Sequence, residues 1–206
     1  LTGFALNHST MPSDHDVIID GFPHPTIPPI LGVPTYATIA DTHLKLNANG
    51  ASVFSSLGDG AHGLLALTVL AAVYNTQSAI AFVTPTNPGP QPNIPNGLTG
   101  NQIAAATRTH TENHRLWKEY LATDKALKQQ LLATVHETYY RTLRNRITGF
   151  ANTTTRQLLE HLYRTYGNIT PADLIENDTR MKTSYDPSQP IEVLYDQIED
   201  AVELAD

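Results

Sequence analysis

The chain has 206 residues, with 13 Lys and Arg against 20 Asp and Glu, 9 His and no Cys. This length allows one or two domains, and the lack of Cys excludes disulfide scaffolds, thiolate nucleophiles and Cys-ligated zinc, so a metal would have to rest on His and carboxylates. The formal net charge of -7 argues against a chain that binds polyanions with its whole surface, because such binding needs excess Lys and Arg. The longest weakly polar run, residues 60–82, is interrupted by polar side chains, so no membrane helix is expected.

The two halves of the chain differ in composition. Residues 1–100 hold 11 of the 14 Pro and 10 of the 12 Gly but a single basic residue, Lys45, whereas residues 101–206 hold 12 Lys and Arg with 15 Asp and Glu. Proline fixes φ and lacks an N–H donor, so the proline-rich stretches predict extended chain rather than helix. The expected regions are a flexible arm over 1–34, a small N-terminal subdomain over 35–83, a Pro-rich connector over 84–100 and an α-helical domain over 101–206. The first residues, which begin with Leu1 and lack a basic segment, favour a piece of a longer protein without a signal peptide.

One helix is predicted in the first half. Apolar side chains recur at helical spacing from Tyr36 to Leu46, which gives a helix over 35–48. The stop signals that follow are Asn47, Asn49 and Gly50. Residues 64–74 are mostly apolar and are expected to be buried. Their pattern fits either a helix or a strand.

The second half is predicted to be a bundle of helices. Thr99 or Asn101 begins a helix, and Asp124 opens another after a break near Ala122, with Gly149 as its stop. Further starts are expected at residues 152–155, at Thr170-Pro171 and at Pro190. The predicted fold class is mainly α, a helical bundle preceded by a Pro/Gly-rich arm with little regular structure. The residues expected in the core of the helical domain are Trp117, Leu121, Leu131, Val135, Leu158, Leu162 and Tyr166.

Two patterns are candidates for chemistry, and each has a simpler interpretation. Residues 58–63, GDGAHG, match the dinucleotide pattern G-x-G-x-x-G, but no acidic residue between Asp59 and Glu112 is present to bind a ribose, so a glycine-rich turn is favoured. His110 and His114 lie one helical turn apart, but no third ligand follows at a suitable spacing, so two ordinary histidines are favoured over a metal site. We therefore expect no catalytic, cofactor-binding or metal-binding residues, and no enzyme. The rival interpretation, an enzyme that uses the glycine-rich loop, predicts saturable nucleotide binding.

A cluster of arginines is the candidate for contact with RNA or another charged surface. Arg141, Arg144 and Arg146 follow one another closely, at a spacing that also suits a solvated helix face paired with nearby Glu137 and Glu160. The overall acidity of the chain favours the ion-paired face.

The order of these segments resembles the Gag capsid region of copia-type LTR retrotransposons. Residues 117–120, WKEY, and the following ATDKALKQQLLATV are similar to the family's helix with a central Trp and its Leu-rich continuation. Residues 154–167, TTRQLLEHLYRTYG, match the next family segment, although His161-Leu162 stands where an aromatic residue is common. Residues 36–69 and the connector 83–95, VTPTNPGPQPNIP, are similar to the leader of one branch of these proteins. The resemblance covers most of residues 35–206.

The resemblance implies a structural protein with a capsid-like N-terminal domain. Such a chain would self-associate through helix faces into a cytoplasmic virus-like particle that encloses the element's RNA, with no reaction catalysed and no cofactor. The zinc knuckle that usually binds RNA in this family needs Cys, so RNA would be held by regions outside this chain. The alternative is a Gag-derived helical adaptor that binds a partner protein without forming a shell.

Overall fold

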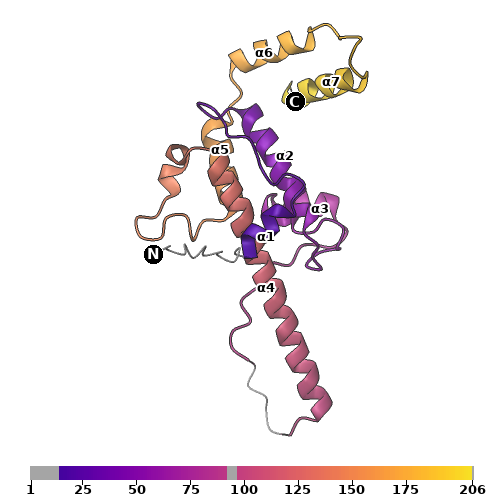
Figure 1. Cartoon of the computed structure of the whole chain (residues 1–206), viewed down its shortest axis with the longest axis vertical. Coiled ribbons are helices and arrows are strands. Elements are labelled where there is room, and N and C mark those ends of the chain that lie inside the picture. The colour runs from indigo at the N-terminus through magenta and orange to yellow at the C-terminus, as the bar shows by residue number, and fades with distance from the viewer. Residues whose placement is uncertain (1–13, 92–96, 206) are drawn as a thin grey trace, which may run out of the picture.

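The computed structural model describes residues 14–91 and 97–205, and almost all of their regular structure is helical (Figure 1). The elements are α1 (Asp14–Asp20), α2 (Tyr36–Ser52), the 3-10 turn η1 (Leu65–Leu67), α3 (Ala71–Gln77), α4 (Gly100–Thr134), the 3-10 segment η2 (Glu137–Leu143), α5 (Thr155–Tyr166), α6 (Pro171–Met181) and α7 (Glu192–Ala205). The described residues contain no strand beyond one antiparallel bridge, Asn145 with Gly149. The mainly α fold class is confirmed.

Four helices begin at a threonine that closes a capping box. In each, the threonine hydroxyl accepts a hydrogen bond from the backbone N–H three residues later, and the side chain of that later residue accepts one from the cap N–H. This reciprocal pair satisfies donors that the first turn of a helix leaves unpaired. The caps are Thr35, Thr99, Thr154 and Thr170. The starts predicted for these helices are therefore confirmed.

α4 is a single helix of 35 residues, so the predicted break near Ala122 is wrong. The hydroxyl of Thr123 donates to the carbonyl of Glu119, and the helix continues through Asp124. The Asp124 carboxylate does not cap its own helix; it accepts the backbone N–H of Thr155, at the start of α5, at 3.0 Å. The Asp124 side chain, which predicts a helix start at this position, instead makes a tertiary contact with α5.

α4 also ends earlier than the periodicity predicts. The carbonyl of its last residue, Thr134, accepts a hydrogen bond from the Ile30 N–H of the N-terminal segment at 2.8 Å. The next residue, Val135, has an extended backbone. A helix continuing to Gly149 is therefore wrong: η2 and a tight turn take its place, and Ile147 is 93% exposed.

A single hydrophobic core joins segments that the sequence analysis assigns to separate regions. Its members come from the N-terminal segment, α2 with the turn after it, the second half of α4, η2 and α5. They are Phe22, Ile27, Ile39, Leu46, Leu64, Leu67, Ala126, Leu127, Leu131, Val135, Tyr140, Leu158, Leu159 and Leu162. The division between a subdomain at 35–83 and a helical domain at 101–206 is corrected, because residues of both share this core. The flexible arm over 1–34 is corrected for its described part, residues 14–34, which contains α1 and contributes Phe22 and Ile27.

The predicted core residues are mostly buried from Thr123 of α4 onward but exposed or partly buried before it. Leu131, Val135, Leu158 and Leu162 are buried, and Tyr166 packs against the core while partly exposed. Two predictions are wrong, because Leu121 is 45% exposed and Trp117 is only partly buried, with its ring 5.7 Å from that of His114. The reason is that the buried residues of α4 begin at Thr123, whereas its first half extends past the bundle (Figure 1).

A buried amide network holds the N-terminal segment against α2 and α4. The Asn49 amide donates to the His24 carbonyl at 2.8 Å and to the Gln130 side-chain oxygen at 2.9 Å, and its oxygen accepts the His24 N–H at 2.8 Å. The Gln130 amide donates to the carbonyls of His24 and Pro25. The sequence predicts a helix stop at Asn49, but α2 continues to Ser52. The amide group of Asn49 finds its hydrogen-bond donors and acceptors inside the protein, so it does not end the helix.

α6 and α7 form a hairpin beyond the end of α5 (Figure 1). The Asn177 amide donates to the Ala201 carbonyl at 2.8 Å, and both residues are buried between the two helices. The remaining large apolar side chains of the hairpin are mostly exposed: Leu174, Ile175, Met181, Ile191, Val193, Tyr195, Ile198 and Val202. The hairpin therefore packs mainly within itself and adds little to the core.

His43 is a partly buried ionisable group between α2, α5 and the turn after η1. Its Nε2 lies 3.2 Å from the Thr68 carbonyl and its Nδ1 lies 3.2 Å from the Tyr163 hydroxyl. A carbonyl can only accept, so Nε2 carries the proton and Nδ1 accepts from Tyr163. Burial lowers the pKa of His43 below its ordinary value of 6.5.

We predict that His43 makes the folded state less stable as the pH falls. Between the lowered folded pKa and the unfolded value of about 6.5 the unfolded chain binds a proton that the folded chain does not, so the free energy of unfolding decreases from pH 7 toward pH 5. His43→Gln should show a shallower decrease than wild type in urea unfolding across this range. His24→Gln, which replaces an exposed ring, is the matched control substitution. Equal slopes for wild type and His43→Gln would contradict this role.

Candidate functional site

The glycine-rich loop at 58–63 is a packing feature. The backbone at Gly63 has a φ of +48°, and a Cβ there would press on the backbone oxygens of Ala51 and Val53 at the end of α2. The next residue, Leu64, donates its N–H to the Gly50 carbonyl at 3.0 Å. The loop is preceded by α2 rather than by a strand, and the 3-10 turn η1 follows it, so the strand–loop–helix arrangement of a dinucleotide site is not formed here.

The two histidines one turn apart lie on the projecting half of α4. The rings of His110 and His114 are 6.4 Å apart, and His114 lies beside Trp117. Within residues 14–91 and 97–205 no group of three or more His, Asp or Glu side chains is placed to hold a metal ion.

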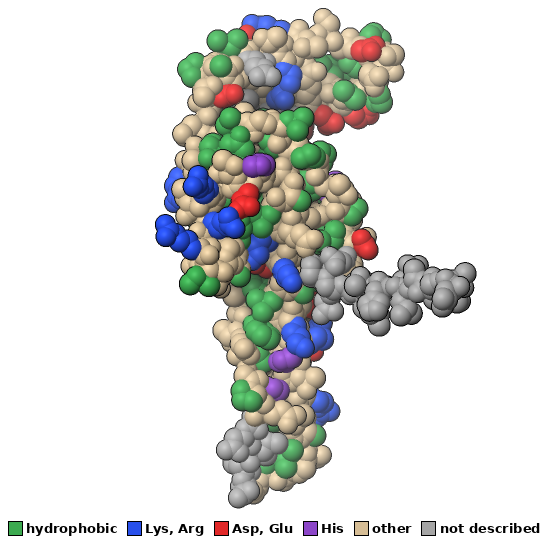
Figure 2. Space-filling view, turned by 60° about the vertical axis from the view of Figure 1, so that its left-hand side comes forward, with side chains coloured by type: hydrophobic (Ala, Val, Ile, Leu, Met, Phe, Trp, Pro, Cys, Tyr) green, Lys and Arg blue, Asp and Glu red, His purple; other side chains and the backbone are tan. Residues whose placement is uncertain are grey.

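The arginine cluster lies at the end of η2 and in the turn that follows. Arg141, Arg144 and Arg146 are exposed, and Arg144 pairs with Glu137 at 2.8 Å, as the interpretation of an ion-paired face predicts. Figure 2 shows Lys and Arg side chains gathered over one side of the central body. The cluster is a local basic surface on an acidic chain, open to solvent.

A groove runs between the second half of α4 and the loop that leads into α5. Its volume is about 680 Å³, and its lining is mainly apolar. The lining residues are Leu121, Asp124, Lys125, Lys128, Gln129, Leu132, Ala133, Phe150 and Ala151. A concave apolar surface of this size with a few charged groups at its edge is typical of a binding site. It is therefore a candidate binding site.

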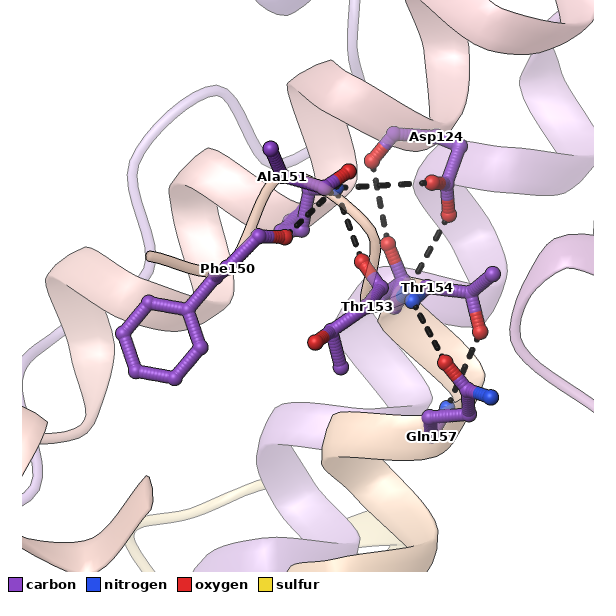
Figure 3. Close-up of polar contacts among 8 residues, drawn as sticks. Asp124, Phe150, Ala151, Thr153, Thr154 and Gln157 are labelled. Carbon is purple, nitrogen blue, oxygen red and sulfur yellow. Dashed lines mark hydrogen bonds and ion pairs between the residues drawn. The ribbon is translucent and has the colours of Figure 1, made fainter. Parts of the chain in front are cut away.

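Lys128 and Asp124 hold the loop that forms one wall of the groove. Figure 3 shows Asp124 beside the loop residues Ala151 and Thr153. The Lys128 ammonium donates to the carbonyls of Thr153 at 2.8 Å, Phe150 at 3.3 Å and Ala151 at 3.5 Å, and it lies 3.9 Å from the Asp124 carboxylate. Asp124 in turn accepts the Thr155 N–H, so its negative charge lies at the N-terminus of α5, where the helix dipole favours it. In Figure 3 the Phe150 ring points away from this cluster.

The structure brings together residues that the sequence analysis leaves separate. Leu121, predicted in the core, lines the groove instead, and the arginine cluster lies in and beside the same loop as Phe150. The spacing of Asp124 and Lys128 marks an ion pair within one helix, but nothing in the sequence shows that their other partners are backbone atoms of residues 150–155. The groove was therefore missed.

Comparisons of the chain with family models, with curated proteins and with solved structures find no match. Among the helices in the described ranges, none combines the length and the apolar character needed to cross a membrane.

We predict that Lys128→Met loosens the wall of the groove. The change removes the charged donor that three carbonyls share, and hydrogen bonds of this kind contribute about 2 kcal/mol. The free energy of unfolding should fall by roughly this amount, and amide hydrogen exchange should become faster at residues 150–155. Lys125→Met, an exposed residue of the same helix, is the matched control and should leave both quantities unchanged. The same behaviour in the two variants would show that Lys128 does not hold this loop.

Proposed function

We propose that this chain is a structural protein that self-associates through its helix faces into a cytoplasmic particle shell, as its resemblance to copia-type Gag capsid proteins implies. It catalyses no reaction in this proposal, and RNA would be held by regions outside the chain.

The observation that carries the proposal is the unpartnered apolar surface of the α6–α7 hairpin. Two short helices pack against each other through Asn177 and Ala201 and expose large apolar side chains elsewhere, among them Ile175 at 68%, Tyr195 at 56% and Val202 at 48%. Adjacent apolar side chains left in water favour association with another surface. The charge of -7 limits non-specific aggregation of such a chain.

Shell assembly makes modest demands on each contact. Many copies of a small interface, each weak alone, give a stable lattice because the second and later contacts of a copy form at high effective concentration. The groove beside α4 and the hairpin supply separate surfaces of this kind. The alternative, a Gag-derived adaptor, would use the same surfaces on a different protein.

The particle size of the purified chain against its concentration tests the proposal. We expect oligomers whose size increases with concentration in sedimentation velocity, and shells or tubes in negative-stain microscopy. Leu31→Glu, which removes a 90% exposed apolar side chain outside the hairpin, is the control for non-specific adhesion and should assemble like wild type. A wild-type chain that stays monomeric at high concentration would overturn self-assembly and favour the adaptor.

A further inference from the structure

One side of α7 carries a continuous apolar stripe that no described residue covers. Tyr195, Ile198 and Val202 recur at intervals of three and four residues, so they share one face of the helix, and Ile191, directly before its first residue, continues the same spacing. In chain order from Ile191, their exposed fractions are 42%, 56%, 40% and 48%. A different face packs on α6, where Ala201 is buried.

The stripe lies in the most acidic part of the chain. Residues 183–206 contain seven Asp and Glu and no Lys or Arg. By helical spacing Glu192, Asp196 and Glu199 lie to one side of the stripe, and α6 lies to the other. The surface that α7 offers is therefore apolar with a negative margin.

The groove beside α4 carries more positive than negative side chains. Its lining contains Lys125 and Lys128 against Asp124, and residues 101–170, which contain both of its walls, hold ten Lys and Arg against five Asp and Glu. Lys125 is exposed at the groove, and Lys118, which is also exposed, lies on the same face two turns before it. The groove therefore offers apolar floor residues, such as Leu121 and Leu132, with a positive margin.

The two surfaces lie at opposite ends of α5. The groove wall at residues 150–153 leads into the first turn of α5, and α6 begins shortly after its last turn. A helix of 12 residues is about 18 Å long, and α7 packs on α6 beyond the far end of α5 (Figure 1), so in this fold it lies away from the groove of its own copy.

We propose that α7 of one copy docks in the groove between α4 and Phe150 of a second copy, with its acidic margin toward Lys118 and Lys125. The inference rests on the proposed self-association and names its contact. The two surfaces are different, so the contact is heterologous and each copy has one of each surface free to continue a ring or a chain. The charge complementarity predicts faster and tighter association at low salt.

Two variants, each blocked at one surface, test the contact. Leu121→Glu places a negative charge in the groove, and Ile198→Glu places a charge of the same sign in the stripe, so the two altered surfaces repel each other. Both residues are exposed in the monomer, so helix content by circular dichroism should not change. Each variant alone should associate at least tenfold more weakly than wild type in sedimentation velocity. An equimolar mixture should form a 1:1 dimer and nothing larger, because one intact groove and one intact α7 remain. Ile147→Glu, at a 93% exposed side chain outside the groove lining, is the matched control and should behave like wild type.

Cross-linking gives a second measurement that does not depend on disrupting the contact. The chain has no Cys, so Ala133→Cys and Ile198→Cys each introduce a single thiol. Under mild oxidation the mixture should give severalfold more disulfide-linked dimer than either variant alone.

The outcomes separate this inference from the proposed function. If wild type assembles but the blocked variants assemble equally well, or if the mixture of cysteine variants gives no excess of linked dimer, the docking of α7 is overturned while self-association stands. If wild type remains monomeric, both are overturned.

Discussion

The hydrogen bonds that Asn49 and Gln130 make inside the protein decide how the first third of the chain meets the long helix α4. Asn49 on α2 pairs with both backbone groups of His24, and Gln130 on α4 bonds to Asn49 and to the carbonyls of His24 and Pro25. Apolar contacts alone would let one helix shift along another, because they have no fixed direction. Buried amides have few relative positions in which all their donors and acceptors are satisfied. The network therefore fixes the register of α2, α4 and the N-terminal segment.

The burial pattern of α4 follows from that register. Its second half is covered by α2, α5 and the segment around Phe22 and Ile27, whereas its first half projects from the bundle. The Ile30 N–H donates a hydrogen bond to the Thr134 carbonyl in the last turn of α4, at the point where this helix ends. Lys128 and Asp124 then hold the returning loop against the outer side of α4, which creates the groove. The groove, one of the two surfaces proposed for self-association, therefore depends on how these polar contacts position α4 and its neighbours.

Local signals in the sequence predict the starts of the four helices with a threonine cap and part of the core. Threonine caps act within four residues, so Thr35, Thr99 and Thr170 could be recognised without the fold. Helix ends are predicted less well. Asn49 is a typical helix-stop residue, but its side chain bonds to Gln130, which is distant in the sequence, and α2 continues past it. The end of α4 lies where the N-terminal segment bonds to its last turn, which no local signal shows.

The same limit applies to the core and the candidate site. Periodicity identified Leu131 and Leu158, which lie where helices cross, but it also selected Leu121, which has the right spacing and no helix over it. Phe22 and Ile27 lie among prolines and carry no periodic signal, although they are buried. The groove joins α4 to a loop about twenty residues later in the chain, and such a contact has no local signature.

Removal of the Asn49 side chain tests the account most directly. Asn49→Ala leaves the buried Gln130 oxygen and the partly buried His24 N–H without these partners, so the free energy of unfolding should fall by about 2 to 3 kcal/mol. Amide hydrogen exchange should become faster at residues 22–30 and at the end of α4 together, because one network holds both. Asn75→Ala, at an exposed asparagine of α3, should change neither. Stability within about 0.5 kcal/mol of wild type, or unchanged exchange at residues 22–30, would contradict the claim that this network organises the fold.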